Sequence, residues 1–187
     1  MKASKGSSFE REICKTLSKW WTQDLDEPRD DIFWRTSQSG GRATTRAKQN
    51  ISTANSYGDV GWIDPIGQSF LDNCLLELKR GYTHEISILD FIDKAKGVPI
   101  LIQWWDKATG ERHLAGRKYT VLIFRRDRHK SCIMISGNMF SDLQNWFGDF
   151  PKDRIEINTY KYNLIIIDFE IFLSWCHPDY FRQKNSK

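Results

Sequence analysis

Residues 70–80 read FLDNCLLELKR, an apolar run that ends in charged residues and predicts a β-strand. Side chains on a strand alternate between two faces, so Leu75, Glu77 and Lys79 share one face. The opposite face carries only apolar side chains and is expected to pack on the core, from Cys74, Leu76 and Leu78. The pattern therefore predicts a strand that buries one face and presents a carboxylate and an ammonium group on the other.

A second short strand is predicted immediately upstream, at residues 60–63, directly after Gly58-Asp59. Between the two predicted strands lies Asp64-Pro65-Ile66-Gly67, which has the proline and glycine positions of a tight turn. We therefore expect an antiparallel hairpin. Such a hairpin folds Asp59 back to the level of Glu77 and Lys79.

Two carboxylates and a lysine at one end of a sheet suit the hydrolysis of a phosphodiester. Mg²⁺ prefers oxygen ligands, which Asp59, Glu77 and the backbone carbonyl of Leu78 would supply. Mn²⁺ is expected to substitute for it. Lys79 would orient or deprotonate the attacking water, or stabilise the charge that develops. The alternative is ordinary: a Glu-x-Lys pair on a strand is commonly a solvated face without chemistry.

The rest of the chain predicts an α/β fold, a mixed β-sheet flanked by α-helices. A first helix begins near Ser7, with apolar residues at helical spacing. Further strands are expected at residues 32–36, 119–125, 131–136 and 163–168. Further helices are expected at residues 87–96, 99–109 (ending at Gly110), 140–146 and 169–175. The tryptophan pairs 20/21 and 104/105 are assigned to the core.

The pattern Gly58-Asp59 with Glu77-Leu78-Lys79 resembles the motif of the PD-(D/E)XK nuclease superfamily, with Gly where the name has Pro. The segment KGSSFERE at residues 5–12 is similar to the opening helix of archaeal-type Holliday-junction resolvases, and the layout is similar to small phage-encoded nucleases. The resemblance implies a restriction-endonuclease-like fold. It also implies that Glu10 completes the metal site and that Gln103 lines it.

Glu10 has a structural alternative, because Ser7-Ser8-Phe9-Glu10 also fits a capping box at the start of the helix. Arg35, followed by Ser39-Gly40-Gly41, resembles the Arg and Ser-Gly loop of the resolvases. DNA phosphates are expected to be contacted by polar residues of this region, namely Arg35, Ser39, Arg42 and Arg46. A second basic cluster, at residues 125–128, is either a solvated turn or a further DNA contact.

Bulk properties fit one domain, residues 1–187, with a core at about 5–136 and an extension at 137–187. The formal charge of +4 permits nucleic-acid binding without requiring it. The four cysteines and four histidines show no zinc-ligand spacing, so reduced thiols and a cytoplasmic location are expected. The longest apolar run, residues 164–173, contains Asp168 and Glu170 and is not expected to enter a membrane.

These observations together predict a Mg²⁺-dependent DNA endonuclease. A first alternative is a Holliday-junction resolvase that acts as a homodimer. A second is a DNA-binding module that keeps the fold without cutting DNA.

Overall fold

The structure is a computed structural model that describes residues 5–36, 57–82, 85–93 and 97–183. The helices are α1 Lys5–Trp21, the 3-10 helix η1 Pro65–Gly67, α3 Gln68–Asn73, α4 Asp90–Asp93, α5 Ile100–Leu114, α6 Gly137–Phe147, α7 Phe169–Trp175 and α8 Asp179–Gln183. The strands are β1 Phe33–Arg35, β2 Val60–Trp62, β3 Cys74–Arg80, β4 Tyr119–Arg125, β5 Cys132–Ser136, β6 Ile155–Asn158 and β7 Asn163–Asp168.

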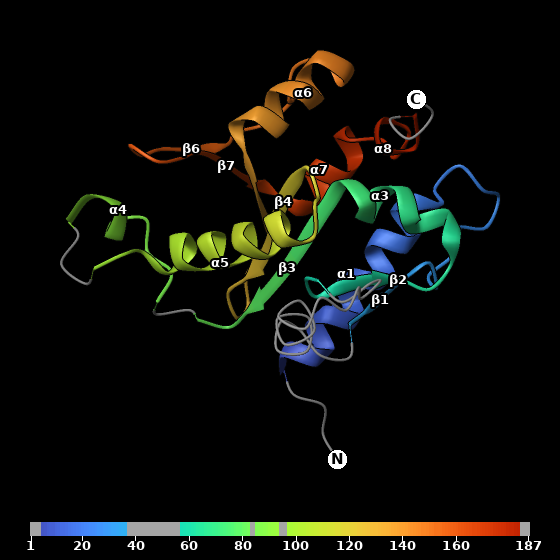
Figure 1. Ribbon diagram of the computed structural model, residues 1–187, viewed down its shortest axis with the longest axis horizontal. Helices are drawn as coiled ribbons and strands as arrows, with labels where there is room; N and C mark the ends of the chain where they lie inside the picture. The colour runs from blue at the N-terminus through green and yellow to red at the C-terminus, as the bar shows by residue number, and fades with distance from the viewer. Residues whose placement is uncertain (1–4, 37–56, 83–84, 94–96, 184–187) are drawn as a thin grey trace.

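The main sheet has five strands in the order β3-β4-β5-β7-β6 (Figure 1). Strand β3 runs parallel to β4, whereas the other neighbouring pairs are antiparallel. Strands β1 and β2 form a separate antiparallel pair. The predicted α/β class, a mixed sheet flanked by helices in a single domain, is confirmed, and the fold is consistent with the restriction-endonuclease type.

Each face of the sheet has its own apolar core. The larger core joins the sheet to α1, α3, α6, α7 and α8, and it includes Cys74, Leu76 and Leu78, as the alternation along β3 predicts. The smaller core lies under α5, which crosses the opposite face (Figure 1). The tryptophan pairs 20/21 and 104/105 are buried in these two cores, so their predicted core positions are confirmed.

The predicted hairpin between residues 60 and 80 is wrong. Strand β2 pairs with β1, and β3 pairs with β4 over its whole length. The side chain of Asp64 accepts a hydrogen bond from the backbone of Ile66 and opens η1 rather than a hairpin turn. Residues 68–73 then continue as α3, which buries Phe70 and Leu71. These two apolar residues, which looked like the start of the strand, are therefore helical core residues.

Other boundaries differ from the expected ones. Helix α5 continues through the exposed Gly110 to Leu114, and α4 covers only residues 90–93 of the helix expected at 87–96, of which 94–96 lie outside the described residues. Strand β6 and helix α8 were not predicted, because β6 is a mostly exposed edge strand and α8 has only five residues. The four cysteines carry thiols rather than disulfides. Within the described ranges, none of the helices has the length and hydrophobicity to span a bilayer.

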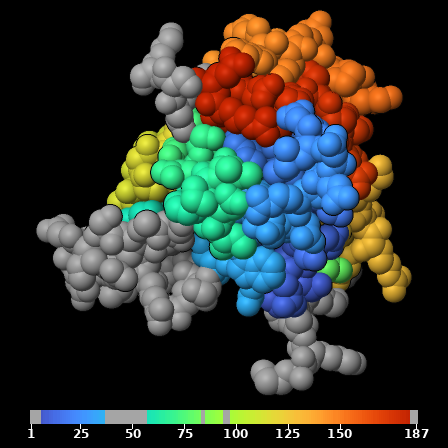
Figure 2. Space-filling model, turned by 90° about the vertical axis from the view of Figure 1, so that its right-hand side faces the viewer, coloured from blue at the N-terminus to red at the C-terminus, as the bar shows by residue number. Residues whose placement is uncertain are grey.

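Residues 176–182 close the larger core against α1. The indole nitrogen of Trp20 donates a hydrogen bond to the carbonyl of Cys176 over 2.7 Å. The guanidinium of Arg182 donates to the carbonyl of Trp21 and lies over its ring. Figure 2 shows the red C-terminal segment lying against the light-blue segment that follows α1. The first helix and the last described helix are thus held together directly.

Candidate active site

Asp59 and Glu77 lie next to each other although no hairpin joins them. Glu77 is in the middle of β3 and is 1% exposed, and Asp59, just before β2, is 6% exposed. The backbone N–H of Asp59 donates to the carbonyl of Leu76 over 2.8 Å. The backbone N–H of Leu78 donates to Oδ2 of Asp59, also over 2.8 Å. These two bonds attach Asp59 to the edge of β3 that β4 does not occupy. Asp59 therefore lies near Glu77, as the sequence predicted, although the predicted cause was a hairpin.

Gly58 is required by this attachment. Its φ of +75° lies in the left-handed region, which proline cannot adopt. A Cβ built on Gly58 would lie 2.7 Å from the carbonyl oxygen of Leu76 and 3.2 Å from Cγ of Leu75. The backbone is held in place here, because the hydroxyl of Thr36 donates to the Gly58 carbonyl over 2.8 Å and the next N–H, of Asp59, donates to the carbonyl of Leu76. Glycine therefore stands at the proline position of the motif for a steric reason.

Gly58→Ala is expected to destabilise the protein by about 2–4 kcal/mol, because it combines a left-handed φ with a backbone clash. Urea unfolding would measure the change. The matched control is Gly110→Ala in α5, where a Cβ would meet nothing within 4 Å. That control should stabilise by about 0.5–1 kcal/mol, since glycine is a poor helix former. Equal stability of the two variants would contradict this account of Gly58.

Two ammonium groups share one oxygen of Glu77. Lys79 Nζ lies 2.5 Å from Glu77 Oε1, and Lys107 Nζ, from α5, lies 3.2 Å from the same oxygen. The second oxygen, Oε2, is buried and has no hydrogen-bond partner among the described residues. Unpaired buried anionic oxygens are costly. The carboxylate of Glu77 thus has capacity left for a cation.

Burial and the adjacent charge of Glu77 raise the pKa of Asp59 to about 7. The N–H of Leu78 and the ammonium of Lys79 act in the opposite direction, and Glu10 adds a further raising contribution. Lys107 is affected by the same charges. Partial burial alone would lower its pKa, but Glu77 and Glu111 raise it. The site therefore contains closely spaced acidic groups, one of which holds its proton up to about neutral pH.

Glu10 and Arg35 lie together beside this pair. Arg35 Nη1, at the end of β1, is 3.4 Å from Glu10 Oε2 on α1, and both side chains are partly exposed. Helix α1 begins at Lys5, so Ser7 lies inside the helix and the capping-box alternative for Glu10 is not supported. Ser39, Arg42 and Arg46, the other predicted phosphate contacts, lie outside the described residues.

Helix α5 contributes Lys107, which the sequence reasoning missed. Gln103, the residue expected from this helix, is exposed and donates its amide to the carbonyl of Val98 over 2.7 Å. Lys107 follows Gln103 by four residues and therefore lies on the same helix face. Its i,i+4 partner Glu111, at 3.7 Å, could be predicted from helical spacing, but that spacing does not indicate the contact with Glu77.

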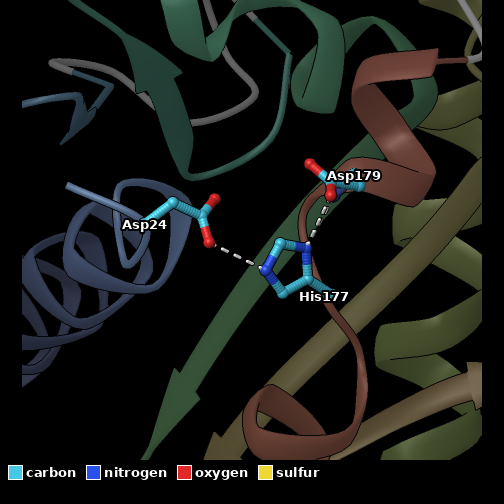
Figure 3. Close-up of side chains that lie close together, drawn as sticks. All are labelled: Asp24, His177 and Asp179. Carbon is cyan, nitrogen blue, oxygen red and sulfur yellow. Dashed lines mark hydrogen bonds and ion pairs between the residues drawn. The ribbon is translucent and has the colours of Figure 1, made fainter.

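Other predicted or possible sites are engaged in ion pairs. Arg125 of the basic turn donates two hydrogen bonds to the carboxylate of Glu12, from Nη1 to Oε1 over 2.7 Å and from Nη2 to Oε2 over 2.6 Å. Its guanidinium also packs over the ring of Phe9. Asp24, His177 and Asp179 lie close enough together to hold an ion, and His177 lies between the two carboxylates (Figure 3). Arg182 already pairs with both carboxylates, at 2.9 and 3.0 Å. This second cluster therefore has its own cation and fastens α8 to the segment after α1.

Comparison with known protein families identifies the family of this chain. Searches of curated proteins and of solved structures give no match. The model of one protein family, described as "Phage putative PDDEXK endonuclease", matches residues 1–183. That range contains Glu10, Asp59, Glu77 and Lys79, and it extends through α8. Since the match covers nearly the whole sequence, the chain belongs to the phage PDDEXK endonuclease family.

Proposed function

We propose that the protein is a Mg²⁺-dependent endonuclease that hydrolyses DNA phosphodiester bonds, with Asp59, Glu77 and the carbonyl of Leu78 as the ion's ligands. The observation that carries this proposal is Glu77 Oε2, which is buried and has no hydrogen-bond partner among the described residues. A divalent cation would compensate that oxygen. It would also favour the ionised form of Asp59, whose pKa is about 7 without it. Oxygen donors suit Mg²⁺ and Mn²⁺.

The bound ion would supply Lewis acidity toward the phosphate and acidify a water. Asp59 has to lose its proton to act as a ligand, so ion binding should strengthen as the pH rises through about 7. Lys79 stays on Glu77 and presents its ammonium group to the reacting phosphate, where it stabilises charge or exchanges a proton with water. Glu10 supports the ion from α1, and Arg35 contacts the DNA backbone.

The test is cleavage of a panel of DNAs: closed circular, linear, single-stranded, flapped and four-way-junction. Cutting of closed circles, which have no ends, identifies an endonuclease. Activity should require Mg²⁺ or Mn²⁺, stop in chelator, and be absent in the Glu77→Gln control, which excludes a contaminating enzyme. Ca²⁺ should support binding alone.

Other outcomes would decide between the remaining alternatives. Paired symmetric nicks on the four-way junction, by a protein that sediments as a dimer, would favour the homodimeric resolvase. Binding of DNA with no cutting of any substrate in Mg²⁺ or Mn²⁺ would favour the non-cleaving module. Undiminished cutting in chelator would refute metal dependence.

A further inference from the structure

Lys107 is the more exposed of the two lysines on Glu77. Its side chain is 52% exposed, compared with 20% for Lys79. It comes from α5, so it approaches Glu77 from the helix that covers this face of the sheet, while Lys79 shares the strand of Glu77. Lys107 also has a second carboxylate within reach, because Glu111 Oε1 is 3.7 Å from its Nζ. Its ammonium group can therefore leave Glu77 without losing every ionic partner.

An ion bound to Glu77 would repel the two ammonium groups that already lie on this carboxylate. A single carboxylate oxygen, Oε1, faces both ammonium groups at 2.5 and 3.2 Å. A dication on the other oxygen, Oε2, would lie on the same carboxylate as these ammonium groups and would repel them, since Coulomb energies fall only as the inverse of distance. Lys79 is the less exposed lysine and belongs to the strand. Lys107, on a flexible four-carbon stem, is the group that can turn away.

We propose that Lys107 is a second substrate-contacting lysine, which neutralises Glu77 in the ion-free protein and contacts a non-bridging oxygen of the scissile phosphate in the DNA complex. This inference rests on the metal-dependent cleavage proposed above. The incoming phosphate is the anion that replaces Glu77 as the partner of Lys107. The ion and Lys107 consequently compete for Glu77, whereas the substrate and Lys107 attract each other. A lysine that only anchored Glu77 would not contact the phosphate, and its removal would loosen Glu77 rather than strengthen ion binding.

The competition between the ion and Lys107 for Glu77 predicts that replacing Lys107 strengthens ion binding but slows DNA cleavage. In Lys107→Met, divalent-ion affinity of the DNA-free protein should rise, on the order of 10-fold, because one repelling charge is gone. Single-turnover cleavage at saturating Mg²⁺ should fall, on the order of 10- to 100-fold, because a phosphate contact is lost. Lys107→Arg, which keeps the charge, should leave ion affinity near the wild-type value and recover part of the cleavage rate.

Ion affinity is measured by calorimetric titration with Mn²⁺, and cleavage by quenched-flow sampling with excess enzyme. The matched control is Lys15→Met on α1, because Lys15 is 54% exposed and pairs with a single carboxylate, Asp30, at 2.8 Å. That control should change neither measurement. Lys107→Gln, with a polar head, repeats the test if the methionine variant melts at a lower temperature.

Weaker or unchanged Mn²⁺ binding by both Lys107→Met and Lys107→Gln would overturn the inference, since Lys107 would then only hold Glu77 in place. An unchanged cleavage rate at saturating Mg²⁺ would overturn it as well. Both results leave the proposed function standing, because the wild-type protein still cuts. A wild-type protein that neither binds Mn²⁺ nor cuts DNA would instead overturn the proposed function, and this inference with it.

Discussion

Replacing Asp59 by asparagine is expected to abolish DNA cleavage and, at the same time, to stabilise the ion-free protein at alkaline pH. Asparagine keeps an oxygen that can accept the hydrogen bond from Leu78 N–H, so the attachment to β3 is preserved. It removes an anionic ligand from the proposed ion site. We expect the cleavage rate to fall on the order of 10³-fold or more, a loss of several kcal/mol of transition-state stabilisation.

The gain in stability follows from the titration of Asp59. Its pKa rises from 3.8 to about 7 on folding, so the folded protein holds this proton more tightly than the unfolded chain. Stability is therefore lost as the pH rises from about 4 to about 7, and the loss stays constant above that. Asparagine does not titrate. Asp59→Asn should match the wild type at low pH and exceed it by on the order of 2–4 kcal/mol above neutrality.

Urea unfolding in chelator at about pH 4 and at pH 8, together with single-turnover cleavage at pH 8, measures both effects. The matched control is Asp30→Asn, since Asp30 is exposed and its pKa is lowered by its hydrogen bond and charge interaction with Lys15. That variant should cut normally and gain no stability at pH 8. Cleavage at the wild-type rate by Asp59→Asn would remove Asp59 from the mechanism. A lower stability at pH 8 would contradict the assigned cost of burying its charge.

Lys79→Ala is expected to lower the single-turnover cleavage rate on the order of 10²-fold or more, which is typical of losing one acid–base or charge-stabilising group. Lys79 Nζ lies 2.5 Å from Oε1 of the buried Glu77, so its ammonium group is held beside the proposed ion site. Thermal stability should fall by only about 1–2 kcal/mol, because Lys107 remains on the same oxygen of Glu77. Activity should thus fall far more than the loss of folded protein explains.

Lys79→Arg separates the charge of this residue from its shape. Arginine keeps the positive charge, but its planar head is always protonated and larger than an ammonium group. We expect it to be impaired almost as strongly as the alanine variant. Lys15→Ala, at an exposed ion pair on α1, is the control that should cut normally. If Lys79→Ala cuts at the wild-type rate, Glu-x-Lys is an ordinary strand face here, and the proposed mechanism fails.

The sequence predicted well those parts whose local pattern and tertiary environment agree. Strands β4 and β7 have the predicted bounds because each is a mostly buried run with clear ends, and α7 has its predicted bounds because Asp168 caps its first turn. The alternation along β3 predicted correctly which side chains join the larger core, but Leu75 and Glu77 on the other face are also buried, under α5. Asp59 was expected near Glu77 and does lie there. The catalytic and binding roles of these residues stay predictions until they are measured.

The local sequence pattern could not predict which strands pair with each other. The Pro–Gly signal at residues 64–67 fits a hairpin turn and the first turn of a 3-10 helix equally well, and only tertiary packing selects the helix. The parallel pairing of β3 with β4 joins strands separated by α4 and α5. Lys107 was missed for the same reason. Its relation to Glu77 depends on where α5 crosses the sheet, and helical spacing within α5 does not contain that information.

The contact between α1 and residues 176–182 has a consequence for the order of events during synthesis. Trp20 bonds to Cys176, a residue that the ribosome adds 156 positions later. Helix α1 also carries Glu10. This side of the site therefore lacks the packing of residues 176–182 against α1 until α8 has been synthesised. A nascent chain halted at β5 would hold every acidic residue of the site and still lack that packing. Under the proposed function, we therefore expect the growing polypeptide not to cut DNA until α8 emerges and docks.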